Sequence, residues 1–405
     1  MNTASRKPST MSGAFDQLAV AWLTMFIIGS DLFVVSPLLP LIAADYTVAS
    51  ASAGLSVTVF AVTYALSAPV LGHIADRVGR RQVLIYCLCA FGAANVLTAL
   101  SVNFTWLLAT RFVAGAAAAG VSPSIYALAG SSGPSKRRAT RLAVVVSGLL
   151  MSLSFGTPLG LLTAASFDWP LVFSALGVLS LALAWANSRV WRNIPTAKGI
   201  AGSADRLAAT AVAEGLAPTV LWSTALYAMY TYLGEGLSAL SYSSEEIAKV
   251  ILFYGCGAIL GTLVGGRMAD RIGAGRTTAI GLAGLGSCLL LLLLALHLGL
   301  LVDLAFGLAS LSAQLFFPAQ QLKLANCFPA RRATMLAWNN SALFLGISLG
   351  SLIGGEAVSL GGFDIDLMIA AAGAFVGWIA NQDGRRRRAE VRIAPPHQPL
   401  GAAAS

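Results

Sequence analysis

LGHIADRVGR, residues 71–80, is repeated later in the chain as GGRMADRIGA, residues 265–274, at a constant offset of 194 residues. The positions identical between the copies are Gly72/Gly266, Ala75/Ala269, Asp76/Asp270, Arg77/Arg271 and Gly79/Gly273. Each copy follows the second long apolar stretch of its half of the chain. A repeat in equivalent positions indicates two halves of the same fold, arranged as parallel repeats, with a binding site at the interface between them.

The composition places most of this chain in lipid. Hydrophobic residues make up 57% and charged residues 11% of the 405 residues, against about 45–50% and about 25% in ordinary soluble domains. Apolar stretches long enough to cross a ~30 Å hydrocarbon core as a helix recur twelve times. Their approximate ranges are 18–42, 51–72, 82–101, 105–129, 141–163, 170–188, 219–238, 246–266, 277–298, 300–322, 334–356 and 365–382. The sequence therefore predicts an all-α integral membrane protein with twelve transmembrane helices in two six-helix, pseudo-symmetric bundles.

The positive charges fall on one side of this predicted arrangement. Of the 26 Lys and Arg residues, 24 lie in the terminal segments or in connections after even-numbered stretches; the exceptions are Arg111 and Lys249. Positively charged connections stay in the cytoplasm, so both termini are expected there, in the inner membrane. The net charge of +9 is then a signal of topology and predicts no nucleic-acid partner.

The longest polar interruption separates the first six apolar stretches from the last six. It spans about 189–217, which we interpret as a cytoplasmic linker. The predicted organisation is a cytoplasmic N-terminal tail at 1–17, bundles at 18–188 and 218–382, and a basic cytoplasmic C-terminal tail at 383–405.

The repeated loop has a physical rationale as a gate. A glycine such as Gly72 lets two helices approach, Gly79 permits a sharp turn, and Asp76 can pair with arginine or cap a helix. The stretch resembles the signature loop of the major facilitator superfamily, in which a glycine, Asp-Arg and Gly-Arg-Arg lie between helices 2 and 3. The second copy departs from it because Ala274 stands where the first has arginine. The resemblance implies the major facilitator fold and a conformational role for Gly72, Asp76, Arg77, Gly79, Arg80, Arg81, Gly266, Asp270, Arg271 and Gly273.

Two further motifs extend the resemblance. Arg111-Phe112-Val113-Ala114-Gly115 in the fourth stretch is similar to the superfamily's intramembrane arginine motif. A guanidinium in mid-membrane costs at least ~2.5–3.5 kcal/mol, so Arg111 is expected to face a polar interior, as a functional group or as a structural tie. The fifth stretch carries Gly148 and the run Gly156-Thr157-Pro158-Leu159-Gly160, which resembles the antiporter motif of the drug:proton antiporter branch, although Thr157 replaces a glycine. Tight helix packing alone also explains these glycines, and Pro158 is expected to bend the helix.

Asp31 is the most costly charge in the sequence. It lies near the middle of the first stretch, where a carboxylate is rarely kept unless it is functional. The segment GSDLFVVSPLLPLIA, residues 29–43, is similar to helix 1 of the arabinose-efflux and chloramphenicol-resistance-like permeases of that branch. This resemblance implies that Asp31 couples protons or binds a cationic substrate. A carrier in which proton and substrate compete for one carboxyl is an antiporter by linkage. The alternative is a permanent structural pair between Asp31 and Arg111.

The remaining candidates are weaker. Glu235 is a second candidate for proton traffic, although solvation at the outer membrane surface or a pair with Lys249 also explains it. In the superfamily, spans 1, 4, 7 and 10 line the central cavity with help from 2, 5, 8 and 11. The polar and aromatic side chains on those spans, for which core packing or a helix-start role is the alternative, are Tyr126, Tyr227, Tyr230, Gln314, Phe317, Asn339 and Asn340.

Together these features predict a secondary active transporter that exports a small amphiphilic compound in exchange for protons by alternating access. A facilitator or proton-linked importer of a sugar or metabolite is the alternative within the same fold. An enzyme is not expected, because the three histidines, His73, His297 and His397, are scattered. No cofactor or metal is predicted, since the sequence has no nucleotide loop of the P-loop type and its five cysteines form no ligand cluster. The expected partners are a small-molecule substrate, protons and the lipid bilayer, with the protein acting as a monomer.

Overall fold

The computed structural model describes residues 11–132, 138–191, 209–299 and 301–393. Ten helical segments in this described part are long and apolar enough to cross a membrane. One of them, Thr334–Gln382, has 49 residues and suffices for two crossings. The predicted all-helical membrane fold is confirmed.

The first half of the chain forms the N-terminal bundle, which we call the N half. Its helices are α1 (Met11–Asp45), α2 (Ser50–Val78), α3 (Arg80–Ala99), α4 (Phe104–Ser131), α5 (Arg138–Met151), α6 (Thr157–Ser166) and α7 (Trp169–Val190). A π-helical turn, Ser152–Gly156, joins α5 to α6, so these three elements together make the predicted fifth span. Because Pro158 has no amide hydrogen, it cannot continue the regular ladder, and the backbone widens just before it.

The second half forms the C-terminal bundle, the C half. Its helices are α8 (Ala209–Thr231), α9 (Leu233–Ala239), α10 (Ser244–Ile272), α11 (Ala274–Leu298), α12 (Val302–Cys327) and α13 (Arg332–Ile393), with a 3-10 turn at Pro329–Arg331. The predicted seventh span is broken at Tyr232, between α8 and α9. The predicted eleventh and twelfth spans are joined in α13, which bends at Gly361 and Gly362, where Gly362 has φ 75°.

Local sequence signals set several of these boundaries. The side chain of Asn103 caps α4 by accepting a hydrogen bond from the Trp106 amide at 2.8 Å. Ser243 and Glu246 form a reciprocal capping box at the start of α10. Gly79 and Gly273 make the equivalent turns of the two repeats with φ of 113° and 90°, values that favour glycine.

The helices extend beyond the apolar stretches from which they were predicted. For example, the second apolar stretch spans 51–72, whereas α2 continues to Val78. Helix α13 continues past the predicted end of the C-terminal bundle to Ile393. Hydropathy marks only the part of a helix that lies in lipid. Most of the predicted tails and linker, at 1–10, 192–208 and 394–405, lies outside the described residues.

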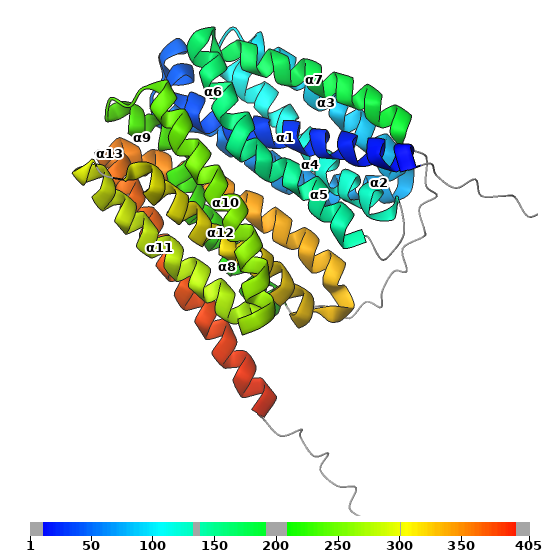
Figure 1. Cartoon of the computed structure of the whole chain (residues 1–405), viewed down its shortest axis with the longest axis vertical. Helices are drawn as coiled ribbons and strands as arrows, with labels where there is room; N and C mark the ends of the chain where they lie inside the picture. The colour runs from blue at the N-terminus through cyan, green and yellow to red at the C-terminus, as the bar shows by residue number, and fades with distance from the viewer. Residues whose placement is uncertain (1–10, 133–137, 192–208, 300, 394–405) are drawn as a thin grey trace, which may run out of the picture.

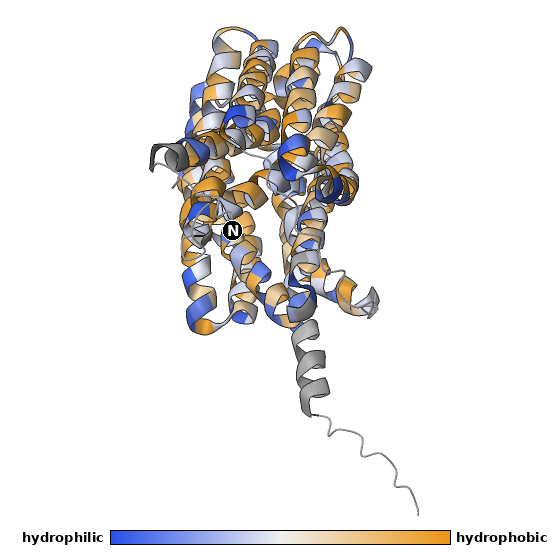
Figure 2. Cartoon of the chain, turned by 90° about the vertical axis from the view of Figure 1, so that its right-hand side faces the viewer, coloured by the Kyte–Doolittle hydropathy of each residue, from blue (hydrophilic) through white to orange (hydrophobic). Residues whose placement is uncertain are grey.

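The two halves converge at one end and diverge toward the other (Figure 1). We call the end where α1 begins the terminal end, and the opposite end, with the α1–α2 and α3–α4 turns, the far end. In Figure 1 the halves meet near α6, α9 and the bend of α13. Apolar residues run along both bundles in Figure 2. Large apolar side chains such as Leu66, Trp185 and Leu294 are exposed. This surface suits a lipid environment.

Helix packing within each half depends on small residues. Gly265 in α10 lies against the backbone of Leu315 in α12, so a Cβ added to Gly265 would sit 2.8 Å from the Leu315 Cα. A Cβ added to the neighbouring Gly266 would meet nothing within 4 Å. Close backbone approach at glycine is the usual way in which membrane helices associate.

Gly265→Ala is therefore expected to destabilise the protein by about 1–3 kcal/mol, because α10 and α12 must separate to accept the methyl group. Gly266→Ala is the matched control and is expected to leave stability unchanged or slightly raised. Thermal unfolding in detergent, followed by intrinsic tryptophan fluorescence, measures both. Equal effects of the two substitutions would contradict this account of the packing.

Candidate functional site

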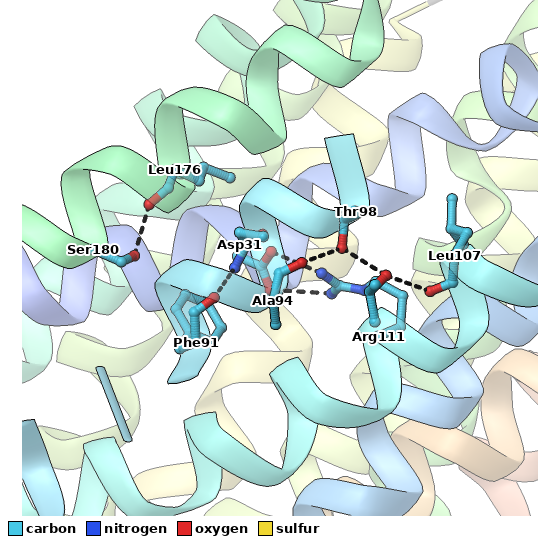
Figure 3. Close-up of polar contacts among 10 residues, drawn as sticks. Asp31, Phe91, Ala94, Thr98, Leu107, Arg111, Leu176 and Ser180 are labelled. Carbon is cyan, nitrogen blue, oxygen red and sulfur yellow. Dashed lines mark hydrogen bonds and ion pairs between the residues drawn. The ribbon is translucent and has the colours of Figure 1, made fainter. Parts of the chain in front are cut away.

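Asp31 on α1 and Arg111 on α4 form an ion pair inside the N half (Figure 3). The two guanidinium nitrogens Nη1 and Nη2 donate to Oδ1 and Oδ2 of Asp31 at 2.8 and 3.0 Å. The exposed fraction is 0% for Asp31 and 1% for Arg111. A bidentate pair of this kind satisfies both charges away from water, and it is the arrangement that a charge inside the membrane requires.

Aromatic rings surround the Arg111 guanidinium. The centre of the guanidinium lies 4.7 Å from the ring centroid of Phe60 on α2 and 5.5 Å from that of Phe173 on α7. Cation–π contacts of this kind hold an arginine in a fixed orientation in a dry environment. Nε of Arg111 has no hydrogen-bond partner in the described part of the chain. Residues of four helices of one half, α1, α2, α4 and α7, thus surround the pair.

A group of buried polar side chains on α3 and α4 lies beside this pair (Figure 3). The Thr98 hydroxyl is 2.9 Å from the Thr110 hydroxyl, and Thr110 donates to the carbonyl of Leu107 at 2.7 Å. Asn95 donates to the carbonyl of Phe91, while its own Oδ1 has no partner among the described residues. The sequence analysis missed these residues because single threonines and asparagines in an apolar stretch carry no pattern.

The C half contacts α1 two residues beyond Asp31. The Tyr230 hydroxyl donates to the carbonyl of Phe33 at 3.1 Å, and the rings of the two residues meet edge to face. The Ser36 hydroxyl donates to the carbonyls of Tyr230 and Thr231 in α8. Helix α1 therefore carries the buried Asp31 carboxylate and also forms hydrogen bonds with α8 of the C half.

A second contact between the halves lies at Tyr64 on α2. Its ring stacks on Phe344 of α13 with centroids 3.5 Å apart, and Asn340 donates to its hydroxyl at 3.3 Å. Asn339, the neighbour of Asn340, accepts instead from Thr219 within the C half at 2.6 Å. Both asparagines were predicted from the sequence, whereas Tyr64 and Phe344 were not, since aromatic residues in an apolar stretch look like ordinary core.

The third contact is the far-end seal, which we define as Gly54, Tyr232, Ser351 and Gly355. Ser351 donates to the carbonyl of Gly54 at 2.8 Å, and Tyr232 donates to the carbonyl of Ser351 at 2.9 Å. A Cβ on Gly54 would collide with the Tyr232 hydroxyl, and one on Gly355 would sit 2.5 Å from it. Small residues thus let the tyrosine bridge α2 and α13.

The glycines predicted in the fifth span pack against α1. Added Cβ atoms on Gly148, Gly156 and Gly160 would collide with the Trp22 carbonyl, the Ser30 hydroxyl and the Val34 side chain. The π-helical turn in the same span lies against the C half, where a Cβ on Gly255 of α10 would sit 2.5 Å from the Ser154 Cα. The fifth span therefore touches both the helix of Asp31 and the opposite bundle.

The repeated loops lie at the terminal end. Asp76 pairs with Arg80 at 2.5 Å, one turn along the chain, and both groups are partly exposed. Arg81 donates to the carbonyls of Ser188 and Trp191 at the end of α7. Added Cβ atoms on Gly72 and Gly266 would meet nothing within 4 Å. In this conformation Asp76, Arg80 and Arg81 of the first loop bind within the N half.

The other predicted cavity residues are half-buried or buried. Tyr227 and Tyr230 meet at 6.0 Å between ring centroids, and Tyr230 meets Tyr254 of α10 at 5.1 Å. Phe317 stacks on Trp222 at 5.7 Å. The half-buried members of the predicted set are Tyr126, Tyr227, Gln314, Phe317 and Asn340.

The predicted alternative of an ion pair between Glu235 and Lys249 is wrong. Lys249 on α10 instead pairs with Asp303 at the start of α12, at 2.6 Å. The two helices lie beside each other, whereas Glu235 is on α9, at a different position around the bundle. Glu235 is half-buried.

The fold and this internal polar site are those of a multi-pass membrane transporter built from two six-helix repeats. The sequence profile described as Major Facilitator Superfamily matches residues 21–244 and 207–399, which together cover most of the chain. This chain belongs to the major facilitator superfamily. It is a secondary transporter that moves a small-molecule substrate across the lipid bilayer, and it is not an enzyme.

Several relatives and solved structures support the assignment. The chain is 29% identical over 338 residues to the uncharacterized MFS-type transporter YceJ of Bacillus subtilis (strain 168), covering 82% of this chain and 86% of that protein. It is 29% identical over 367 residues to the uncharacterized MFS-type transporter YbcL of the same organism, covering 88% and 92%. The fold matches a bacterial homolog of the human lysosomal transporter Spinster, in an inward-facing, occupied conformation, with a TM-score of 0.78, 17% identity, and coverage of 96% of this chain and 100% of that one. It also matches the human organic anion transporter MFSD10 with a TM-score of 0.69, 17% identity, and coverage of 93% and 100%.

Removing one partner of the buried pair is expected to be more harmful than removing both. Arg111→Met leaves the Asp31 carboxylate without a counter-charge, which is expected to destabilise the protein by about 3–5 kcal/mol. The double variant Asp31→Asn/Arg111→Met removes both charges and is expected to recover a large part of that loss. Thermal unfolding of the two single variants and the double variant gives the coupling energy. Additive effects would contradict a direct pair.

Proposed function

We propose that this protein is a proton-driven exporter of a small amphiphilic compound, a drug or a metabolite, working by alternating access. The observation that carries the proposal is the fully buried Asp31 carboxylate, held by Arg111 on the helix that also contacts the opposite half. A carboxyl in this position exchanges a proton only when its ion pair with Arg111 breaks. Protonation of Asp31 is therefore coupled to movement of α1 relative to α4.

The coupling follows from the contacts of α1. When a proton neutralises Asp31, the Arg111 guanidinium loses its counter-charge and is drawn toward water or toward a polar group of the substrate. The backbone of α1 around Phe33 and Ser36 is bonded to Tyr230 and Thr231. A shift of α1 therefore changes the contact between the halves. Proton and substrate that favour opposite arrangements exchange for one another by linkage.

The side chains between the halves suit an amphiphilic cargo. Tyr64, Phe344 and Tyr230 supply aromatic rings, the two tyrosines supply hydroxyls, and Asn340 adds an amide. Rings of this kind bind apolar groups with few polar anchors, which is typical of small-molecule sites. Gly156, Pro158 and Gly160 of the fifth span add support from the resemblance to the antiporter branch.

We further propose that both termini lie in the cytoplasm of a cell with the protein in its inner membrane, that the terminal end faces the cytoplasm, and that the transporter works as a monomer. The distribution of 24 of 26 basic residues supports the orientation. The structure, which converges at the far end, then represents a state directed toward the cytoplasm.

A facilitator or proton-linked importer of a sugar or metabolite is the second candidate. The observation that favours it is the completeness of the Asp31–Arg111 pair, in which each carboxylate oxygen receives a guanidinium donor and Asp31 has 0% exposure. A pair that never opens would act only as a structural tie between α1 and α4.

The deciding experiment uses inverted membrane vesicles with an imposed proton gradient and a pH-sensitive dye. A panel of lipophilic cations, phenicols and sugars is added to vesicles that contain the wild type or Asp31→Asn. We expect at least one panel member to release protons from wild-type vesicles, with at least a tenfold loss in Asp31→Asn because its amide cannot carry the proton.

Asp303→Asn is the matched control. It also neutralises an aspartate that is paired with a basic residue, but this pair is partly exposed at the start of α12, so proton release is expected to be unchanged. Transport of a panel member without any proton signal would overturn the exchange mechanism and favour the facilitator.

The proposed orientation has its own test. Green fluorescent protein fused after Ser405 is expected to be fluorescent, because it folds in the cytoplasm, and alkaline phosphatase inserted in the α3–α4 turn at Val102 is expected to be active outside. Swapping the two reporters is the control and is expected to silence both. Activity of the swapped pair would reverse the orientation.

A further inference from the structure

Asp366 is a buried carboxyl that the proposed exchange at Asp31 does not use. It lies in α13, four residues after the bend at Gly362, and its exposed fraction is 0%. Neither Oδ1 nor Oδ2 has a hydrogen-bond partner in the described part of the chain. Asp31 has the same burial but a bidentate arginine, so the two acids differ in how their charge is compensated.

The Asp366 carboxyl lies beside the far-end seal. The position of a Cβ on Gly354 would be 3.0 Å from Asp366 Oδ1, 3.0 Å from Tyr232 Cδ2 and 3.1 Å from the Ala228 Cα. The carboxyl is thus packed near the ring of Tyr232. The hydroxyl of the same tyrosine donates to Ser351, which in turn donates to Gly54 of the N half. One aromatic ring separates the carboxyl from the contact that joins α13 to α2.

The charged groups around Asp366 do not offer it a cation. Glu235 on α9 and Glu356 on the first part of α13 are, with Asp366, close enough to the Tyr232 hydroxyl to interact with it electrostatically. Asp364 lies 3.4 Å from His297 at the end of α11, and that pair is partly exposed. Lys249 on α10 is engaged by Asp303. Among the described residues, Asp366 therefore has neither an ion-pair partner nor a hydrogen-bond donor.

A carboxylate in this place is expensive. Moving a charged group out of water costs several kcal/mol even in a relaxed protein. Two arrangements avoid it. Either the carboxyl carries a proton while Tyr232 covers it, or water reaches it when Tyr232 moves away.

We propose that Asp366 is a second proton-binding site, which holds its proton while the far-end seal is closed and releases it when the seal opens to water. The proposal goes beyond the exchange at Asp31 and does not depend on it, nor on the direction in which substrate moves. Because the closed state binds the proton more tightly, acid favours closure and alkali favours opening. For one proton, the ratio of open to closed molecules changes by at most about tenfold per pH unit.

The test measures a distance across the far end in purified protein in nanodiscs. Spin labels are placed at Val102 in the α3–α4 turn and Leu301 before α12, which are 85% and 74% exposed, after the five native cysteines are replaced. In the wild type, pulsed electron–electron double resonance between pH 5 and 9 is expected to show that the population with a longer distance between the two spin labels grows as pH rises. In Asp366→Asn, which cannot ionise, the short distance is expected to persist at every pH.

Two variants distinguish this site from its surroundings. Asp364→Asn changes an acid two residues away and is expected to keep the wild-type response, since that group is partly exposed and already faces His297. Asp31→Asn changes the open-to-closed ratio by shifting α1, but the dependence of that ratio on pH is expected to persist because Asp366 is intact. Failure of the exchange at Asp31 and failure of this proposal therefore give different results. A pH response in Asp366→Asn like that of the wild type, or no response in the wild type, would overturn the proposal.

A spectroscopic measurement tests the proton directly. Infrared difference spectra between acid and alkaline protein are expected to contain a carbonyl band of a protonated carboxylic acid that is lost in Asp366→Asn and shifts in Asp366→Glu. This readout remains valid if Asp366→Asn alters the far-end distance for structural reasons. A distance change driven by Na⁺ in place of K⁺ at constant pH, without the infrared band, would replace the proton with a metal cation and refute the proposal.

Discussion

A charge buried in a membrane-spanning helix needs a counter-charge within reach, and the Asp31–Arg111 pair meets this constraint at the centre of the N half. The neighbouring helices are arranged around it. The rings of Phe60 and Phe173 cover the guanidinium, and the glycines of the fifth span allow the backbone of that span to lie against α1. The packing of the N half thus excludes water from one ion pair. A change in the charge of Asp31 or Arg111 is therefore expected to change how the surrounding helices pack.

The contacts between the halves are of another kind. Among the described residues they include hydroxyls bonded to carbonyls, at Ser36, Tyr230 and Ser351, the Asn340 amide bonded to the Tyr64 hydroxyl, and ring contacts of Tyr64 and Tyr230. The ion pairs described above each lie within one half. A neutral hydrogen bond contributes about 0.5–1.5 kcal/mol, so the halves can separate in small steps while each bundle stays intact. This division of strong contacts within bundles and weak contacts between them is what alternating access requires.

The sequence predicted the fold well because the bilayer imposes a length and a polarity on each helix. It predicted the internal repeat and the sharp turn at Gly79, where φ is positive, and Gly273 makes the equivalent turn in the second copy. Asp31 and Arg111 were predicted because a charge interrupts an apolar stretch, and Tyr230 and Asn340 were named only as members of a larger set of polar and aromatic side chains. Tyr64, Phe344 and Tyr232 were missed because their role depends on which helix face meets the other half, and hydropathy carries no such information. Asp366 lies at the predicted start of the last span, where a carboxyl is expected to be in contact with water. In the structure it is buried, because α13 bends at Gly361 and Gly362 and places the carboxyl beside Tyr232.

The two buried aspartates respond to different events. Asp31 loses its counter-charge only if Arg111 moves, which depends on α1 and α4 and on what occupies the space between the halves. Asp366 has no counter-charge to lose among the described residues, so its state depends on whether water can pass Tyr232. Because one acid is controlled by the packing of the N half and the other by the seal between the halves, their protons can be taken up and released at different stages of one transport cycle. Such a separation lets the seal respond to the pH on the side to which it opens even while Asp31 remains paired.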